Sequence, residues 1–280
     1  MQTDKATRVH RAVTAAEAVA ARYGLPARRT RVLHDANNVV VHLAPSPVVA
    51  KVCPAASGGW DKLEREVEVA RHLIRAGAPV VGPSRELPAG PHAADGFAIT
   101  FWRHHSHEAG ALLSGRFCAE TLAAVHSALA GYPAPLPSFL DRRVKRTGDT
   151  LCEPSHPTAL LAPDRAFLQR EYISITSRLE TCRLENQPLH GDPHAGNFLV
   201  GRNGCLMIDF ESVCAGPVEW DVSALPGGGA GVFAVDEELL AVLLRLRSIC
   251  VAVWCAGRAA RSNEMARAAS LHLGLLREAA

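Results

Sequence analysis

Length and composition set the first limits on this chain. It has 280 residues, of which 48% are hydrophobic and 21% are charged, enough to bury one large core or two smaller ones. Lys and Arg number 30 while Asp and Glu number 28, so the formal charge of +2 gives no strong field for nucleic acid or an anionic membrane. We therefore expect a globular protein with neither of these as a partner and with no obligate protein partner.

Two further features favour a cytoplasmic location. Residues 1–22 carry six charged side chains, so they lack the apolar stretch of a secretory signal. The longest window without Asp, Glu, Lys or Arg, Thr121–Leu140, contains three prolines and makes a poor membrane span. The eight cysteines form no C-x-x-C pair, which favours buried reduced thiols over a zinc or redox motif.

The N-terminal part is predicted to form a small sheet followed by a helix. Val32–Leu33, Val39–Leu43 and Val48–Val52 are short runs rich in β-branched residues, and turn-forming residues separate them, which predicts an antiparallel meander. Leu63–Ala76 has apolar residues at near-helical spacing and ends before a Gly-Ala-Pro sequence, which predicts one amphipathic helix. Phe97–Trp102 is a further apolar run, and the polar residues after it predict a hinge.

The rest of the chain is predicted to be mainly helical. Helical patterns cover Phe117–Leu129, Arg165–Leu184, Leu239–Ala260 and Met265–Leu276. We therefore expect an α+β fold with two lobes. Residues 1–103 would form the first lobe with the hinge, and residues 104–280 would form the helical second lobe.

A hairpin interrupts the helical part. It consists of two apolar runs around a tight turn, Phe198–Val200, Arg202–Gly204 and Leu206–Ile208. A three-residue loop, 202–204, would pair Asn197 directly with Asp209 and bring both side chains to one face. A two-residue Asn-Gly turn would instead pair residue 198 with Asp209 and turn Asn197 to the other face. The chemistry of these side chains favours the three-residue loop.

The residues that carry chemistry lie in two neighbouring segments. His190, Asp192 and Asn197 have the spacing H-x-D-x-x-x-x-N, and the second apolar run ends in Asp209-Phe210. Phosphoryl transfer needs one carboxylate to orient the attacking hydroxyl and accept its proton, and it needs oxygen ligands for Mg²⁺. The two segments supply two carboxylates and an amide at a suitable spacing, so they indicate a phosphotransferase.

These segments resemble the aminoglycoside phosphotransferase and choline kinase-like family, and the resemblance covers most of the chain. Val49–Val52 is similar to the strand with the phosphate-binding lysine, and Arg65–Val69 to the helix whose glutamate pairs with that lysine. Leu122–His126 is similar to the first helix of the second lobe, and Gly216–Val222 to the stretch after the D-F sequence. The resemblance implies a two-lobed protein kinase-like fold, with nucleotide bound by the first lobe and the catalytic loop and acceptor pocket in the second.

The resemblance also implies a role for each matching position. Asp192 is expected to be the catalytic base, and Asn197 and Asp209 are expected to bind Mg²⁺. His190 and Asp221 are expected to brace the catalytic loop. The donor is expected to be ATP, with GTP as an alternative. The expected nucleotide-binding residues are Lys51 on the phosphates, Glu66 that holds it, Asn37 and Asn38 of the phosphate loop, and the hinge backbone of Phe101, Trp102 and Arg103.

The sequence departs from the protein kinase pattern. The loop His34–Asn38 contains no glycine, so the G-x-G-x-x-G cover over the phosphates is missing. Gly191 stands where protein kinases have an arginine, and no A-P-E motif follows, which disfavours a protein substrate. Helical spacing alone does not distinguish Glu66 from Glu64 and Glu68, and only the resemblance selects it. No G-x-x-x-x-G-K-[ST] sequence occurs, which argues against a P-loop NTPase.

The acceptor is predicted from local charge. Between Asn186 and Leu244 there are eight carboxylates and one basic residue, Arg202. We interpret this tract as a negative pocket for an aminoglycoside or another cationic antibiotic, such as a basic cyclic peptide, which would make the chain a resistance enzyme. A simpler interpretation is that most of these carboxylates are solvated. The candidate acceptor-binding residues are Glu211, Asp236, Glu237 and Glu238, and specificity is expected in segments 140–165 and 225–240.

Three alternative interpretations stay open. One is a metabolic kinase for a choline, homoserine or sugar type of substrate, and a second is a nucleotide-binding pseudokinase. A third treats His190, Asp192 and His194 as metal ligands of a hydrolase, which would need further histidines at recognisable spacing. The local histidine cluster at 104, 105 and 107 has a simpler explanation as a solvated hinge.

Overall fold

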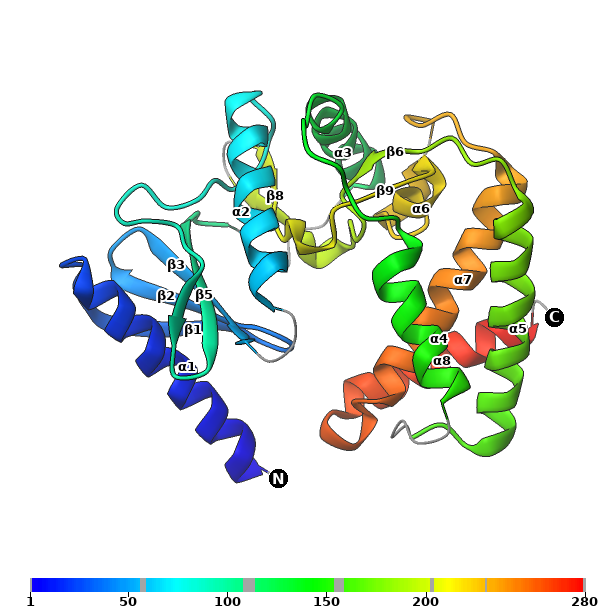
Figure 1. The fold of residues 1–280 in the computed structure, drawn as a ribbon, viewed down its shortest axis with the longest axis horizontal. Helices are drawn as coiled ribbons and strands as arrows, with labels where there is room; N and C mark the ends of the chain where they lie inside the picture. The colour runs from blue at the N-terminus through cyan, green and yellow to red at the C-terminus, as the bar shows by residue number, and fades with distance from the viewer. Residues whose placement is uncertain are drawn as a thin grey trace. The chain divides into compact units, whose positions relative to one another are not determined.

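The computed structural model describes residues 2–55, 59–107, 114–153, 159–201, 204–229 and 231–278 (Figure 1). The chain divides into two compact units. The first unit comprises residues 1–133 and 194–213, and the second comprises residues 134–193 and 214–280. The first unit therefore also includes residues 104–133 and the hairpin. The lobe boundary expected after residue 103 stays a prediction.

The first unit is built on an antiparallel five-stranded sheet with the order β1-β2-β3-β5-β4. The strands are β1 (Ala27–Asp35), β2 (Val39–Pro45), β3 (Val48–Pro54), β4 (His92–Ala94) and β5 (Phe97–Arg103). The predicted meander and the fourth apolar run are confirmed. Strand β3 lies between β2 and β5, so its side chains are buried on both faces of the sheet.

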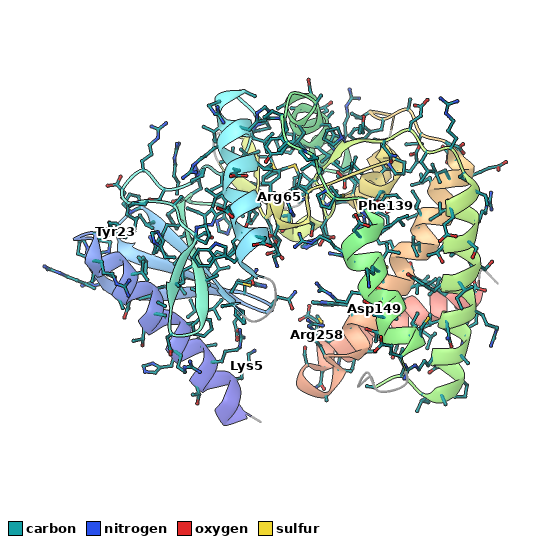
Figure 2. The ribbon with its side chains drawn as sticks, in the orientation of Figure 1. Lys5, Tyr23, Arg65, Phe139, Asp149 and Arg258 are labelled. Atoms are coloured by element: carbon teal, nitrogen blue, oxygen red, sulfur yellow. The ribbon has the colours of Figure 1, made fainter. Side chains whose placement is uncertain are left out.

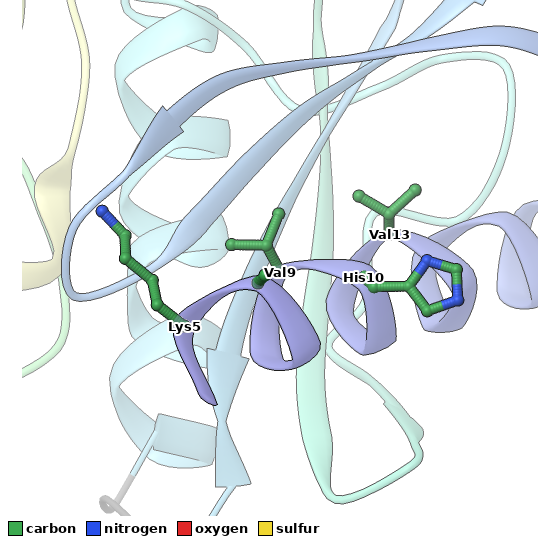
Figure 3. A pocket seen from close by; sticks show the side chains of 5 residues that line it. Lys5, Val9, His10 and Val13 are labelled. Carbon is green, nitrogen blue, oxygen red and sulfur yellow. The ribbon is translucent and has the colours of Figure 1, made fainter. Parts of the chain in front are cut away.

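Helix α1 (Gln2–Arg22) covers one face of this sheet (Figure 1) and has no counterpart in the sequence-based prediction. Its buried residues are small and recur at helical spacing: Ala12, Ala15, Ala16, Val19 and Ala20. That spacing is the signal that could have revealed the helix. A surface hollow on the same helix contains none of the predicted site residues (Figure 3), and it is lined by Lys5, Ala6, Val9, His10 and Val13.

Helices α2 (Gly59–Arg75) and α3 (Gly115–Leu129) complete the first unit and confirm two predicted helices. The chain leaves α2 through Gly77, whose φ of 74° is the left-handed conformation that glycine adopts without strain. The buried face of α2 is apolar apart from one carboxylate and consists of Gly59, Leu63, Glu66, Val67, Val69, Ala70 and Leu73.

The hairpin of the first unit has a different register from the predicted one. Strand β7 (Phe198–Gly201) pairs with β8 (Gly204–Met207), and Gly201 lies opposite Gly204. The predicted three-residue loop is therefore wrong. Gly204 stays in the ladder with a φ of 115°, which its missing Cβ permits, so only two residues remain for the loop. Those two residues, 202 and 203, lie outside the described residues.

This register changes how the predicted metal ligands are positioned. Asn197 ends the short 3₁₀ helix η3 (Ala195–Asn197), and Asp209 follows β8, so both lie beyond the ladder. The N–H of Ile208 donates to the carbonyl of Asn197 at 3.1 Å. The prediction that Asn197 faces Asp209 across the ladder is therefore wrong, because strand pairing ends before it reaches either side chain.

The second unit is mainly helical. Its helices are η2 (Leu140–Val144, a π-helix), α4 (Lys145–Cys152), α5 (Ala162–Thr181), α6 (Val218–Val222), α7 (Glu237–Ala256) and α8 (Asn263–Glu278), with two short 3₁₀ helices, η5 (Pro226–Gly229) and η6 (Ala259–Arg261). Three of them, α5, α7 and α8, confirm predicted helices. Helices α4, α5 and α7 pack on one another, and α8 packs on α7 (Figure 1). A two-stranded sheet of β6 (Gln187–Leu189) and β9 (Cys214–Gly216) leads into the loop with the H-x-D sequence.

Helix α7 supplies much of the core of the second unit. Phe139 and Trp220 belong to the same core, and the centroids of their rings are 5.3 Å apart. Phe139 is labelled in Figure 2. Within the described part of the chain, α7 alone is long and apolar enough to cross a membrane, but half of its apolar window is buried inside the unit. Its burial against the rest of the second unit is consistent with a core helix.

Candidate functional site

Lys51 lies at the centre of a buried charged cluster in the first unit. Its Nζ donates to both carboxylate oxygens of Glu66, at 2.8 and 2.9 Å, and to Oδ1 of Asp209 at 2.6 Å. Oε2 of Glu211 lies 3.2 Å from the same Nζ and 2.7 Å from the Nζ of Lys62. We call these five residues the lysine cluster. One buried ammonium in it contacts three carboxylates.

The helix face decides which glutamate meets Lys51. Glu66 is buried on α2 with a side chain only 2% exposed, whereas Glu64 and Glu68 are exposed. Residues spaced two positions apart point in different directions on a helix with 3.6 residues per turn. Only one of the three glutamates therefore points toward the sheet. The structure therefore places Glu66 where the resemblance expects it.

Asp209 reaches Lys51 through an unusual backbone conformation. Its φ of 68° and ψ of 58° are left-handed, a conformation that few residues other than glycine adopt. The chain then turns into the short 3₁₀ helix η4 (Phe210–Ser212), which packs on α2. This turn brings both Asp209 and Glu211 to the lysines. Such conformations cost free energy and concentrate at functional sites.

The charges of the lysine cluster shift the pKa of its members. Burial raises the pKa of Glu66 to about 7, although Lys51 acts against it. For Glu211, burial would raise the pKa, but Lys51 and Lys62 outweigh it and lower the pKa to about 2. Burial also opposes the charge of Lys51, yet the three carboxylates raise its pKa well above the usual value. Lys51 is therefore charged, and Glu66 takes up a proton near neutral pH.

The same carboxylates fit a divalent cation. Among the described residues, only Glu66, Asp209 and Glu211 gather three potential metal-ligand atoms within 4.8 Å of one another. With all three carboxylates ionised, they exceed the two ammonium groups by one charge, and carboxylate oxygen is the donor that Mg²⁺ prefers. The predicted ligand Asn197, which precedes Asp209 in the sequence, is also buried, with 4% of its surface exposed. His190, Asp192 and His194 form no such group, so the hydrolase interpretation gains no support.

The phosphate loop joins the lysine cluster through one asparagine. Asn38 is 8% exposed, and its Nδ2 donates to Oε2 of Glu211 at 3.1 Å. Its Oδ1 is buried without a hydrogen-bond partner among the described residues. Asn37 is exposed. The two predicted loop residues therefore differ, and Asn38 is the one tied to the charged cluster.

The predicted hinge already uses several of its backbone donors. The N–H of Phe101 donates to Ala89, and that of Arg103 donates to Gly82. The Trp102 indole donates to the hydroxyl of Thr100 at 2.9 Å. The N–H of the next residue, His104, also donates to a carbonyl, that of Pro47, at 2.9 Å.

Partly buried apolar side chains flank the hinge within the first unit. Val49 of β3 and Leu199, Leu206 and Ile208 of the hairpin segment pack on the core cluster that contains Trp102. Because they are only partly buried, they keep an apolar surface that a flat aromatic base could cover.

The loop with the H-x-D sequence is held by Asp221 in the second unit. Oδ2 of Asp221 accepts the N–H of His190 and Oδ1 accepts the N–H of Gly191, both at 2.8 Å. Asp221 and His190 are fully buried, and Nδ1 of His190 accepts the N–H of Asp192 at 3.3 Å. Gly191 has a φ of 87°, so a side chain there would be strained. This is the geometry that the predicted bracing requires.

Two arginines hold the carboxylate of Asp192. Nη2 of Arg143 donates to its Oδ2, and Nη1 of Arg247 donates to its Oδ1 at 3.3 Å. We call these three residues the arginine clamp. Burial, and then the like charge of Arg143, lower the pKa of Arg247 to about 10, while Asp192 acts in the opposite direction. Both oxygens of the predicted base are therefore oriented by positive charge.

The four predicted acceptor-binding carboxylates are not brought together. Glu211 belongs to the lysine cluster in the first unit. Asp236, in the second unit, caps α7 by accepting the N–H groups of Glu238 and Leu239 at 2.9 and 3.0 Å. Glu237 and Glu238 are exposed. A cap and a solvated first turn are what acidic residues commonly provide at a helix start.

Sequence reasoning missed three charged residues of these centres: Lys62, Arg143 and Arg247. Arg143 belongs to the basic run 142–146, which contains four basic residues and could have been noticed. Arg247 stands out as a charge within the apolar run of α7, and a buried charge requires a partner. Nothing in the pattern around Lys62 distinguishes it from a solvated helix residue.

The chain shares its fold with solved structures of small-molecule kinases. Amicoumacin kinase in complex with AMP-PNP and Ca²⁺ is 12% identical, with 89% of this chain and 88% of that chain covered and a TM-score of 0.67. Choline kinase from Streptococcus pneumoniae is 15% identical, with 94% of this chain and 99% of that chain covered and a TM-score of 0.66. A phosphotransferase, APH(2″)-IIIa, in complex with GDP and kanamycin is 16% identical, with 93% of this chain and 96% of that chain covered and a TM-score of 0.65. The predicted α+β kinase-like fold is confirmed. Among curated proteins, none matches this sequence.

The family follows from the sequence itself. A model of the phosphotransferase enzyme family matches residues 28–259, which is most of the chain. The matched span includes the whole lysine cluster and the arginine clamp. The chain therefore belongs to the phosphotransferase enzyme family, and the small-molecule kinase expected from its H-x-D-x-x-x-x-N and D-F sequences is confirmed.

Proposed function

We propose that the chain transfers the γ-phosphoryl group of ATP, or of GTP as an alternative donor, to a hydroxyl group of a small molecule in the cytoplasm. The observation that carries this proposal is the buried contact of Lys51 with Glu66 and Asp209, because it gathers a phosphate-binding cation and a metal-binding carboxylate. Membership of the phosphotransferase family supports the reaction class.

The first unit supplies the nucleotide-binding groups in this proposal. Lys51 contacts the phosphates, and Glu66 keeps its ammonium in place. Asn197 and Asp209 hold Mg²⁺, with Glu211 as a further oxygen donor. When bound, the cation neutralises negative charge on the phosphate oxygens. Surplus negative charge in the lysine cluster fits this assignment.

The adenine base is assigned to the apolar surface beside the hinge. Val49, Leu199 and Ile208 contribute this surface, and the hinge backbone of Phe101–Arg103 is assigned to the edge of the base. Burial of an aromatic ring between apolar side chains stabilises binding, and few polar contacts are needed to orient it.

Asp192 is the catalytic base of the proposed reaction. The acceptor oxygen forms a bond to the γ-phosphorus while the bond to the bridging oxygen breaks, and ADP leaves with that electron pair. The hydroxyl proton passes to the carboxylate of Asp192. Arg143 and Arg247 fix both carboxylate oxygens, so the base is oriented before the acceptor arrives. Only four residues separate Asp192 from Asn197, so the proposed base and a proposed metal ligand belong to the same short loop segment.

Two acceptor classes enter the proposal. A cationic antibiotic is favoured by the kanamycin and amicoumacin named for two of the similar structures. A metabolic hydroxy compound is favoured by the similar choline kinase.

The test is ADP release in the presence of ATP and Mg²⁺ over a panel of aminoglycosides, basic cyclic peptides, choline, homoserine and simple sugars. We expect acceptor-dependent release with one class and a loss of about 10²- to 10⁴-fold in Asp192→Ala, with nucleotide affinity unchanged. Turnover that survives in Asp192→Ala would exclude Asp192 as the base. Nucleotide binding without release on any acceptor would favour the pseudokinase.

A further inference from the structure

Helix α1 carries two basic side chains that reach the phosphate loop. Nη2 of Arg8 donates to Oδ1 of Asp35, and Nζ of Lys5, labelled in Figure 3, lies 3.2 Å from Oδ2 of the same carboxylate. Lys5 and Arg8 are three positions apart, so they lie on the same face of the helix. The side chain of Asp35 is only 15% exposed, and a carboxylate that is largely removed from water requires partners of this kind.

The phosphate loop links Asp35 to Asn38 through a short turn. Asp35, the last residue of β1, lies opposite Val39 in the ladder with β2, so only residues 36–38 connect the two strands. The N–H of Ala36 donates to the carbonyl of Asn38 at 3.3 Å. A turn of three residues between paired strands has few conformations. A shift of Asp35 would therefore move Asn38.

Asn38 extends these contacts to the lysine cluster. Its Nδ2 donates to Oε2 of Glu211 at 3.1 Å, and that oxygen lies 3.2 Å from Nζ of Lys51. Its Oδ1 is buried without a hydrogen-bond partner among the described residues. A buried carbonyl oxygen without a partner costs free energy, so other contacts must hold the amide in this orientation. The ion pairs of Asp35 at the other end of the turn are such contacts.

We propose that Arg8 and Lys5 are positioning residues for nucleotide binding. They fix Asp35, and through it the phosphate loop and Asn38, in the conformation that receives the phosphates of the donor. The inference rests on the proposed function, because it takes this loop as part of the nucleotide site. Helix α1 precedes residues 28–259, which the family model matches, so the support comes from a segment outside that match.

The physical reason is the presence of a carboxylate in a loop that binds phosphates. Phosphate groups bound at the loop would repel Asp35, and the repulsion is stronger where water is largely excluded. The two basic side chains reduce this repulsion and hold the carboxylate in one orientation through charge-assisted contacts. Arg8 is expected to contribute more than Lys5, because their side chains are 30% and 64% exposed.

The test measures binding of AMP-PNP with Mg²⁺, and of adenosine, to the full chain by calorimetry. The two probes share base and ribose, so only AMP-PNP reports on the phosphates. In Arg8→Gln we expect AMP-PNP to bind about three- to tenfold more weakly, while adenosine binding is unchanged. Lys5→Gln should cause a smaller loss, and Arg8→Lys should recover part of the affinity because it restores the charge.

Arg11→Gln is the matched control. Arg11 lies three positions after Arg8 on the same helix, and its Nε is 2.8 Å from Oδ2 of Asp95, in the turn between β4 and β5. This variant removes the same charge and breaks an ion pair that does not involve the phosphate loop. We expect it to leave AMP-PNP binding unchanged. Denaturant unfolding verifies that both variants are folded.

A second comparison tests whether Arg8 acts through Asp35. If Arg8 positions this carboxylate, Arg8→Gln should change AMP-PNP affinity by less than about twofold once Asp35→Asn is present. If Arg8 instead contacts the phosphates directly, its loss should persist in that background, and its assignment as a positioning residue is then wrong.

The outcomes separate this inference from the proposed function. It is overturned by unchanged AMP-PNP affinity in Arg8→Gln, by equal losses in Arg8→Gln and Arg11→Gln, or by an equal loss of adenosine binding. Each of these outcomes leaves the proposed function standing if ADP release depends on Asp192. Absence of AMP-PNP binding by the wild type contradicts the proposed function, and the inference is then overturned with it.

Discussion

The lysine cluster and the arginine clamp differ in the charge of the group at their centre. In the lysine cluster, two ammonium groups face three carboxylates. In the arginine clamp, two guanidinium groups face one carboxylate. Each centre sits within its own unit of the chain and combines buried with partly exposed side chains. A single fold thus holds one centre built around a lysine and one built around a carboxylate.

The difference follows from the cost of burying charge. An uncompensated buried ion costs several kcal/mol, so each centre pairs its buried charges within the protein. The side chains also differ in how they are held. Lys51 is a point charge that shares its donors among three carboxylates, whereas Arg247 is fixed by its planar fork and by stacking. The first centre suits metal and phosphate, and the second suits a positioned base.

The largest expected effect comes from reducing the negative charge of the lysine cluster. In Asp209→Asn we expect turnover to fall by about 10²-fold or more, because one oxygen ligand of the cation is weakened and Lys51 loses a partner. Nucleotide affinity measured against Mg²⁺ concentration should lose its dependence on the metal. The same metal dependence in the variant and the wild type would contradict the assignment of Asp209.

Removing the central cation should destabilise the first unit. In Lys51→Met we expect the free energy of unfolding to fall by about 3–5 kcal/mol, because Glu66 stays buried without its ion pair. Lys51→Met/Glu66→Gln should recover much of this loss. Denaturant unfolding measures both, and Lys145→Met, which breaks an exposed pair with Asp149, is the control with a loss below about 0.5 kcal/mol. If Lys51→Met lost no more free energy of unfolding than the control Lys145→Met, the ion pair of Lys51 would add nothing measurable to stability.

The smallest expected effect is a pH dependence that belongs to Glu66. Its pKa of about 7 in the folded chain lies above the ordinary value of 4.5, so the folded state binds more protons in this window. Its contribution to stability is therefore present below about pH 4.5 and is lost as the pH rises to about 7. Glu211 has the opposite sign, because its lowered pKa contributes stability above pH 4.5 that is lost toward about pH 2.

Glu66→Gln should remove this titration. The stability difference between wild type and variant is expected to change by about 2–3 kcal/mol between pH 4.5 and pH 7, measured without nucleotide or metal, and to stay constant above pH 7. The comparison with the variant cancels the histidines that titrate in the same range. A difference that does not vary with pH would mean that Glu66 keeps its ordinary pKa beside Lys51.

Sequence patterns predicted local structure well and spatial pairing less well. The strands around Lys51 and the helices α2, α3, α5, α7 and α8 follow from apolar spacing, and the structure confirms them. Helix α1 was detectable from its alanines but not predicted. The hairpin was predicted with the wrong register, because whether Gly204 stays in the ladder or joins the loop depends on the whole hairpin. The left-handed conformation of Asp209 has no sequence signal at all, since such strain is maintained by surrounding contacts.

The sequence by itself determined the family, the reaction class and the residue types for the reaction, because these are encoded in short spacings such as H-x-D-x-x-x-x-N. Tertiary structure alone decided which charges meet. Lys51 and Asp209 are 158 positions apart, and Asp192 and Arg247 are 55 apart. It assigned Glu211 to the lysines and gave Asp192 two arginines, because electrostatic energy depends on distance and burial in space rather than on separation along the chain.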